Sequence, residues 1–419
     1  MTGPPEKDEY QRAAQRDAQM WARGGSPRHA APEGGSPPGD RRGGSRPEDR
    51  GRGWRDEPGR SAVPPARFRS YYGRPIVKKP VWREDIPSYF YTGGLAAGCA
   101  MMAAGADATG LPGLRRACRT TSLGAVGLST FFLIRDLGMP SRFHHMLRVA
   151  KPTSPMSVGT WILSMFGPAA GLAAAAEAAH LLPERGVSGA VRRLLPGAGR
   201  IGGYTAAAIA PALATYTAVL IADTAVPSWH EAYPEMPFVF AGSALGSASG
   251  LGLLAAPIAE TGPARRVAVA GAAIELAAAR TIETRLGLLS EPYREGRAGR
   301  LLRAGRNLTA LGVAGALLGT RSRVATALSG AALLVAPALT RFGLYYGGVA
   351  SAEDPKYTVV PQRDRLAREG PASATAEPPE LFGVAGMIRT VGARLRRDGR
   401  QPTTSTASDR RGINSPTTG

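Results

Sequence analysis

Long apolar segments recur along the middle of the chain, and they constrain its fold more than any other feature. They lie between residues 86 and 350, and short breaks rich in Arg or Pro separate them. A helix needs about 20 predominantly apolar residues to cross the hydrocarbon core of a bilayer. The pattern therefore predicts an all-α, polytopic membrane protein with about eight transmembrane helices. The expected spans are 86–109, 117–135, 156–182, 201–226, 236–259, 265–283, 305–320 and 324–348.

The two ends of the chain differ from this middle. Residues 1–80 and 351–419 are rich in Arg, Gly, Pro, Ser and Thr and have little apolar periodicity. We therefore expect mostly disordered tails around a transmembrane helical domain at 81–350. The segment 380–397 is the exception, because its pattern fits a basic amphipathic helix lying on a membrane.

The net charge of +20 is concentrated in the tails and loops. A basic chain can bind nucleic acid, but no motif of a nucleic-acid-binding fold accompanies the charge. We therefore expect the lipid bilayer as a partner, and no nucleic acid.

Small residues recur at a spacing of four within several expected spans, as at Gly242, Gly246 and Gly250. This spacing lets helix backbones approach closely in lipid, where no hydrophobic effect drives helices together. We expect close helix contacts there.

The chain has two cysteines, Cys99 and Cys118. An iron–sulfur cluster takes about four thiolates, so two cysteines cannot hold one. Haem is not expected either, because its axial histidines would have to lie inside the spans and His180 alone comes near this. We therefore predict no metal in this chain, and any redox metal must belong to a partner.

Several carboxylates lie inside the expected spans, among them Glu177, Asp223 and Glu275. Ionisable groups are costly within a bilayer and are functional by default. We interpret these three as candidates for proton transfer to or from a redox site.

The loop between the second and third expected spans holds the densest polar cluster, with Arg142, His144, His145, Arg148 and Lys151. Such a cluster at the membrane surface suits a quinone headgroup, a carboxylate or an anionic partner. The alternative is a basic loop that binds phospholipid headgroups.

At this loop the chain resembles the NrfD/polysulfide reductase membrane-subunit family. The resemblance lies in DLGMPSRF at 136–143 and RVAKPTSPMS at 148–157. Further matching pieces, in the family's order, are IPSYFYTGGLAAG at 86–98, YTAVL at 216–220, VPSWH at 226–230, PFVFAGSAL at 237–245 and RFGLYYGG at 341–348. The resemblance covers about residues 76–363.

The resemblance implies two four-helix bundles, no haem, and a quinone or menaquinone as substrate. It also implies a ferredoxin-like iron–sulfur subunit and a molybdopterin catalytic subunit as partners in the cell membrane (the inner or plasma membrane). The family's quinone-binding tyrosine on the fourth helix corresponds to Tyr216, and the Asp of its loop motif corresponds to Asp136. The family's usual Tyr-Thr-Gly is replaced by Tyr-Thr-Ala here. This difference affects local helix packing more than the role of the tyrosine.

We expect a membrane anchor subunit that binds quinone or quinol and exchanges electrons with the iron–sulfur partner, and that is inactive alone. In this hypothesis Tyr216 donates a hydrogen bond to a quinone carbonyl, with Arg142 and Lys151 nearby. Asp136 and His145 exchange the protons that accompany the electrons. A secondary transporter and a purely structural membrane anchor remain the alternatives.

Overall fold

The computed structural model describes residues 75–369 apart from 182, 184–185 and 320. The expectations for the tails at 1–74 and 370–419, including the amphipathic helix at 380–397, lie outside these residues. The described chain remains helical past residue 350.

Eight long helices make up most of the described part of the chain, which contains no strand. The first four are α2 (Asp85–Ala108), α3 (Pro112–Asp136), α4 (Pro155–Glu177) and α5 (Gly186–Ala222). The second four are α7 (Met236–Ala255), α8 (Gly262–Arg285), α10 (Gly296–Leu318) and α11 (Arg323–Glu353). Short helices connect them: η1 (Pro140–Leu147), η2 (Ala179–Leu181), α6 (Pro227–Glu231), η3 (Ile258–Glu260), η4 (Gly287–Ser290) and α9 (Glu291–Arg294). The all-α class is confirmed.

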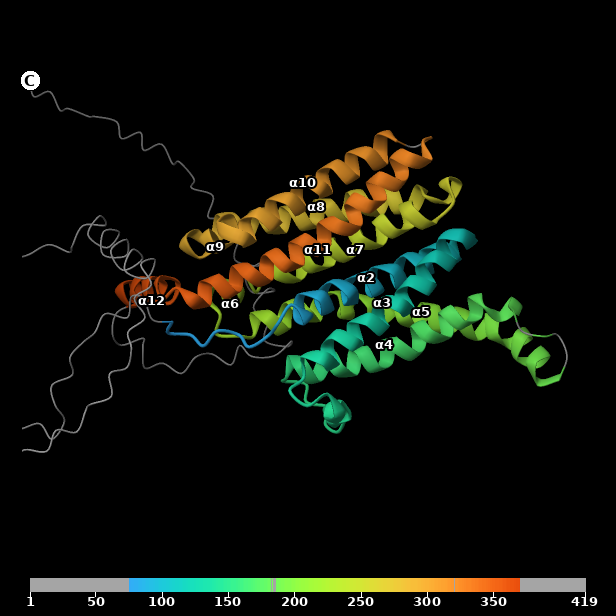
Figure 1. The fold of residues 1–419 in the computed structure, drawn as a ribbon, viewed down its shortest axis with the longest axis horizontal. Helices are drawn as coiled ribbons and strands as arrows, with labels where there is room; N and C mark the ends of the chain where they lie inside the picture. The colour runs from blue at the N-terminus through green and yellow to red at the C-terminus, as the bar shows by residue number, and fades with distance from the viewer. Residues whose placement is uncertain (1–74, 182, 184–185, 320, 370–419) are drawn as a thin grey trace, which may run out of the picture.

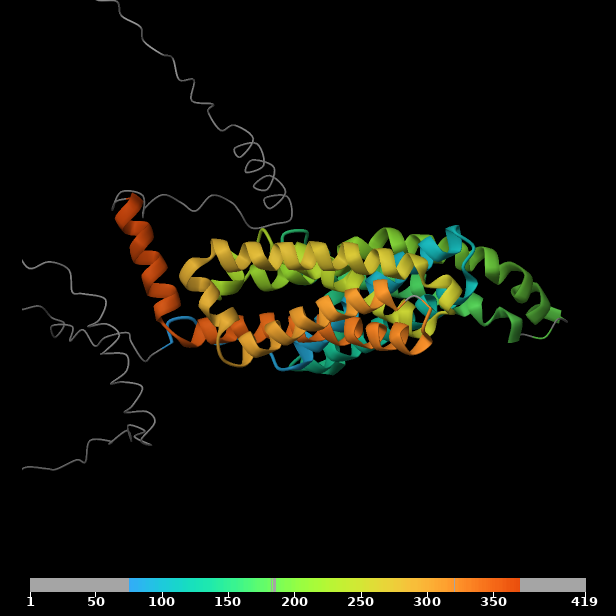
Figure 2. The same ribbon diagram turned by 90° about the horizontal axis from the view of Figure 1, so that it is seen from above.

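The long helices form two four-helix bundles that lie side by side (Figure 1). Helices α2–α5 pack together as the first bundle, and α7, α8, α10 and α11 pack together as the second. Helix α7 contacts α2, α5 and α11, so it joins the two bundles. Helix α12 (Lys356–Glu369) turns across one end of the second bundle, and we call this the α12 end (Figure 2).

Five helices are long and apolar enough to cross a membrane: α3, α4, α5 over Ser188–Ala222, α7 and α11. Helices α2, α8 and α10 are of similar length but do not meet the same test of length and composition. The number of about eight transmembrane helices therefore stays a prediction. Two expected spans begin later than their helices, because α5 continues through Pro196 and α10 begins ahead of its arginines.

Small residues bring α7 against three neighbours, as their spacing predicts. A Cβ added at Gly98 of α2 would lie 2.2 Å from the Ala244 carbonyl oxygen of α7. A Cβ at Gly242 would lie 2.5 Å from the Glu275 nitrogen of α8, and one at Gly250 2.6 Å from the Gly330 oxygen of α11. These backbones touch, so any larger side chain at the three positions would separate the helices.

Candidate functional site

A small cavity in the first bundle is lined by both Tyr216 and Asp136. Its volume is about 40 Å³, and its wall is mostly apolar. Helices α2, α3, α4 and α5 and the short helix η1 all contribute to it. The other lining residues are Trp82, Ile86, Tyr89, Leu133, Leu137, Met146, Met156, Thr160 and Leu220.

The Tyr216 ring is held by α4 and α2. A Cβ added at Gly159 of α4 would lie 2.1 Å from a Tyr216 ring carbon, so only a glycine leaves room for the ring there. The Tyr89 ring meets the Tyr216 ring edge-on, with 6.4 Å between their centroids. The Tyr216 hydroxyl is buried and has no hydrogen-bond partner among the described residues. Such a group costs about 1–3 kcal/mol when it stays unpaired, so it is ready to bond a ligand.

Asp136 is the last residue of α3 and is half-buried. One of its carboxylate oxygens accepts a hydrogen bond from the Arg83 backbone N–H at 3.4 Å. The carboxylate therefore lies at the edge of the cavity, where the segment before α2 meets the end of α3.

The remaining residues predicted for this site are on η1 or just after it, and they do not line the cavity. Arg142, His145 and Lys151 are all exposed. The η1 residue that does line the cavity is Met146, which is half-buried. The structure thus brings Tyr216 and Asp136 together and leaves the three cationic or imidazole side chains outside.

The three residues predicted for proton transfer are far apart in the fold. Glu177 is the last residue of α4, at the end of the first bundle that is remote from α12. Its carboxylate accepts hydrogen bonds from Arg115 at 2.8 Å and from the buried Arg119 at 3.0 Å. Asp107 of α2 joins the same cluster through Arg115 at 3.2 Å. These contacts tie three helices of the first bundle together.

Asp223 follows α5 and lines a separate cavity of about 360 Å³ with His230 and Tyr357. Partial burial raises the pKa of the Asp223 carboxyl, and the nearby His230 imidazole opposes this shift. This cavity lies between the end of α5, α6 and α12.

Glu275 is buried in the second bundle, where it accepts a 2.8 Å hydrogen bond from the Thr340 hydroxyl. The adjacent Arg341 is also buried and interacts electrostatically with Glu275. Its guanidinium donates to the Phe240 carbonyl at 2.8 Å and lies 3.6 Å over the Phe240 ring. Arg341 was not predicted from the sequence as a functional residue, although an arginine inside an apolar helix is itself a signal.

A cavity of about 50 Å³ adjoins Glu275. It is lined by Tyr293, Thr340, Glu283 and Arg306 among others, and the Tyr293 hydroxyl is buried with no partner among the described residues. One water needs roughly 10–15 Å³ and two to four polar partners. The wall is mostly apolar, but Glu275, Glu283, Arg306 and Thr340 supply such partners, so this cavity can hold water.

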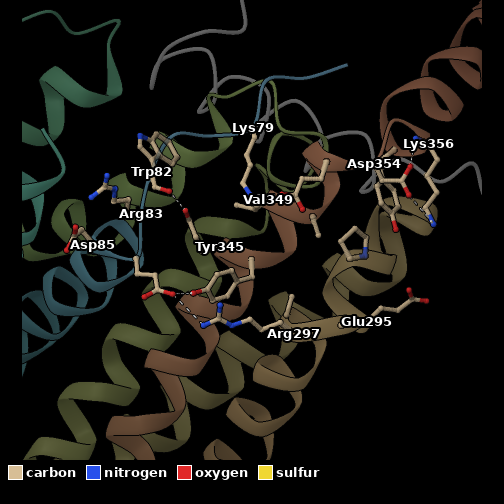
Figure 3. A pocket seen from close by; sticks show the side chains of 18 of the residues that line it. Lys79, Trp82, Arg83, Asp85, Glu295, Arg297, Tyr345, Val349, Asp354 and Lys356 are labelled. Carbon is tan, nitrogen blue, oxygen red and sulfur yellow. Dashed lines mark hydrogen bonds and ion pairs between the residues drawn. The ribbon is translucent and has the colours of Figure 1, made fainter. Parts of the chain in front are cut away.

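A much larger cavity, of about 930 Å³, opens at the α12 end (Figure 3). The segment before α2, the start of α10 and the end of α11 surround it. Ion pairs cross it, such as Lys79 with Glu353 at 2.5 Å and Arg297 with Glu84 at 3.5 Å. It was not predicted, because three distant segments of the sequence build it.

Trp82 lines both this large cavity and the small cavity beside Tyr216. Its ring stacks on Trp229 with 5.9 Å between centroids, and the Tyr345 hydroxyl donates to its backbone carbonyl. In the fold Trp82 separates an apolar cavity from a charged one.

These features define an all-helical, multi-pass membrane protein with buried polar sites in each bundle. The family model for NrfD, polysulphide reductase, matches residues 77–293, which is more than half of the chain. The chain belongs to the NrfD family, and it is a membrane subunit of the kind found in oxidoreductase complexes. The matched range contains Asp136, Tyr216 and Glu275 and ends before α10 and α11. Compared with curated proteins, the chain has no match.

Proposed function

We propose that this chain is the quinone-reactive subunit of a membrane oxidoreductase. It binds quinone or quinol in the cavity beside Tyr216 and exchanges electrons with an iron–sulfur subunit. That subunit connects it to a molybdopterin catalytic subunit, and the complex lies in the cell membrane. The chain alone has no catalytic activity in this proposal.

The buried, unpaired Tyr216 hydroxyl is the observation that carries the proposal. It lines a cavity whose wall is otherwise mostly apolar. A quinone is an apolar ring with two carbonyl acceptors, so its ring matches the wall and one carbonyl can accept from the phenol. A hydrogen bond of this kind contributes about 0.5–1.5 kcal/mol.

Asp136 supplies the proton chemistry at the same cavity. Reduction of a quinone takes up two electrons and two protons, and oxidation of a quinol releases them. A carboxylate within reach of the carbonyl accepts or donates these protons as a general acid or base. His145 adjoins Met146 in the chain and is exposed, so it can pass protons between this edge of the cavity and water.

The cavity must widen to admit a quinone ring. Its volume is about 40 Å³, whereas an apolar cavity that binds benzene measures roughly 150 Å³. Met146 and Met156 line it, and methionine side chains adapt their shape readily. We infer that these two side chains move when the ring enters.

The electron partner has to supply the metal, because two cysteines cannot hold a cluster. The charged cavity at the α12 end adjoins the Tyr216 cavity, since Trp82 lines both. Docking of the iron–sulfur subunit over this end brings its cluster toward the quinone.

The test is to purify the tagged chain in mild detergent, measure iron in the complex, and follow quinol-dependent reduction of the iron–sulfur subunit. Asp136→Asn keeps the shape and removes the proton acceptor, so kcat should fall about 100-fold while KM changes little. Glu260→Gln is the matched control, because this half-buried carboxylate also accepts a backbone N–H, from Leu114 at 2.7 Å, and lines neither the Tyr216 cavity nor the large cavity. An iron-free homo-oligomer that transports solute in liposomes would contradict the proposal.

A further inference from the structure

The short helix η1 has two chemically distinct faces. Its backbone bonds connect residues three apart, as from the Arg142 N–H to the Met139 carbonyl at 3.0 Å and from the Arg148 N–H to the His145 carbonyl at 3.2 Å. A 3₁₀ helix has three residues per turn, so residues at this spacing share a face. One face therefore carries Pro140, Phe143 and Met146, and another carries Arg142, His145 and Arg148.

The surroundings of η1 continue this division. Phe143 is 45% exposed, and Val149, which lies just beyond the helix, is 66% exposed. Lys151, also beyond the helix, adds a further exposed cation. Exposed phenylalanine and valine side chains are unfavourable in water but suit the boundary between headgroups and acyl chains.

Charge in this region is all of one sign. Residues 137–176 contain no Asp or Glu. The side chains of Arg142, Arg148 and Lys151 are exposed and form no ion pair with any described residue. A group of basic side chains without acidic neighbours attracts an anionic surface, at about 1 kcal/mol per cation near the headgroups.

The position of η1 fits a membrane better than the partner subunit. It joins the end of α3 to the start of α4, two helices that can span a bilayer, so it lies at the level of the membrane surface. Figure 1 shows it projecting sideways beyond α4, away from the second bundle and from α12. A bilayer surrounds the flank of a membrane protein, whereas a partner subunit docks on an end.

We propose that η1 and the residues up to Lys151 form a docking surface for anionic phospholipids. The basic face binds lipid phosphates, and Phe143 and Val149 insert beside them into the acyl-chain boundary. Arg142 and Lys151, which the sequence suggested as quinone contacts, thereby bind lipid headgroups. Since Met146 belongs to the wall of the Tyr216 cavity, this lipid contact also fixes part of that wall.

A fluorescence experiment on the full chain in lipid nanodiscs tests this surface. Phe143→Cys provides an attachment point for an environment-sensitive dye, because Cys99 and Cys118 are buried. In discs of phosphatidylcholine with added phosphatidylglycerol, we expect a blue-shifted emission that acyl-chain brominated lipids quench. Combining Arg142→Gln, Arg148→Gln and Lys151→Gln should raise the amount of phosphatidylglycerol needed at least tenfold, since each cation contributes roughly fivefold.

The matched control removes the same charge elsewhere, with Arg266→Gln, Arg300→Gln and Arg321→Gln. These three arginines are exposed and distant in sequence from η1. The control should respond to phosphatidylglycerol as the wild type does. Free phosphate should have no effect on the dye.

Two results would overturn the proposal. One is a dye that reports water in every lipid mixture, or the same response with and without the three cations. The other is a dye that becomes buried only when partner subunits are added, because the surface would then bind protein. Neither result depends on whether the Tyr216 cavity binds quinone, so the two proposals fail independently.

Discussion

The two bundles each contain a buried tyrosine with an unpaired hydroxyl beside a small cavity, but the cavities differ in charge. In the first bundle the cavity is mostly apolar, and its carboxylate, Asp136, is at the edge. In the second bundle the cavity is lined by the buried Glu275 and also by Glu283 and Arg306. The Tyr293 hydroxyl there has polar neighbours that can share a water, whereas Tyr216 has few.

This difference separates two uses of buried polar groups. In the second bundle, Glu275 accepts a hydrogen bond from the Thr340 hydroxyl and Arg341 donates one to the Phe240 carbonyl, so these bonds hold α7, α8 and α11 together. In the first bundle the Tyr216 hydroxyl has no such bond, so a neutral ligand with an acceptor oxygen fits it. Variants in the second bundle should therefore change stability, and variants in the first should change quinone kinetics.

The largest expected effect comes from Arg341→Met, which removes the guanidinium that donates to the Phe240 carbonyl and lies near Glu275. A hydrogen bond from a charged group contributes about 1.5–3 kcal/mol, so the free energy of unfolding should fall by about this amount. The midpoint of thermal unfolding in detergent measures the loss. Adding Glu275→Gln to the same chain should restore part of the stability, because a neutral amide does not need the nearby cation. If Arg341→Met left the midpoint unchanged but raised KM for quinol, the division between the bundles would be wrong.

Gly159→Ala should have an intermediate effect, and on kinetics. A methyl group at this position meets the Tyr216 ring, so the phenol must move. Overpacking of this kind costs about 1–3 kcal/mol, and displacing the hydroxyl should raise KM for quinol.

Gly167→Ala on the same helix is the control, because a Cβ there meets nothing within 4 Å. It should leave KM unchanged. Equal KM values for the two alanine variants would show that the Tyr216 ring does not contact the substrate.

Tyr216→Phe should slightly stabilise the protein when no quinone is bound. It removes a buried hydroxyl without a described partner, whose unpaired state costs about 1–3 kcal/mol. Tyr293→Phe should stabilise less, because a water held by the charged and polar side chains of its cavity can bond the Tyr293 hydroxyl. The midpoints of thermal unfolding of the two delipidated variants measure the difference. A larger gain in stability for Tyr293→Phe than for Tyr216→Phe would contradict the contrast between the two cavities.

Much of the helical architecture could be predicted because the bilayer makes hydropathy decisive. The expected span 86–109 corresponds to α2 at Asp85–Ala108, and 236–259 to α7 at Met236–Ala255. The early start of α5 was missed because Pro196 and the arginines near it were interpreted as a break. A helix tolerates such residues where it leaves the apolar layer.

The site was predictable where a motif marked it and unpredictable where the fold built it. Asp136 and Tyr216 came from the family resemblance, and their shared cavity depends on α3 and α5 being neighbours of α2. Met146, Gly159 and Trp82 carry no chemical signal in the sequence, because a methionine, a glycine and a tryptophan are common in membrane proteins. Arg341 was overlooked since most arginines here lie in loops and tails.

The most direct test compares Tyr216→Phe with Tyr293→Phe in quinol-dependent reduction of the iron–sulfur subunit. Each variant removes one buried, unpaired hydroxyl and keeps the ring, so packing and complex assembly should be alike. The Tyr216 variant should raise KM for quinol up to roughly tenfold, as expected for one hydrogen bond of about 0.5–1.5 kcal/mol. The Tyr293 variant should retain the wild-type KM. Wild-type kinetics for Tyr216→Phe at normal complex levels would contradict the assignment of the quinone to the first bundle.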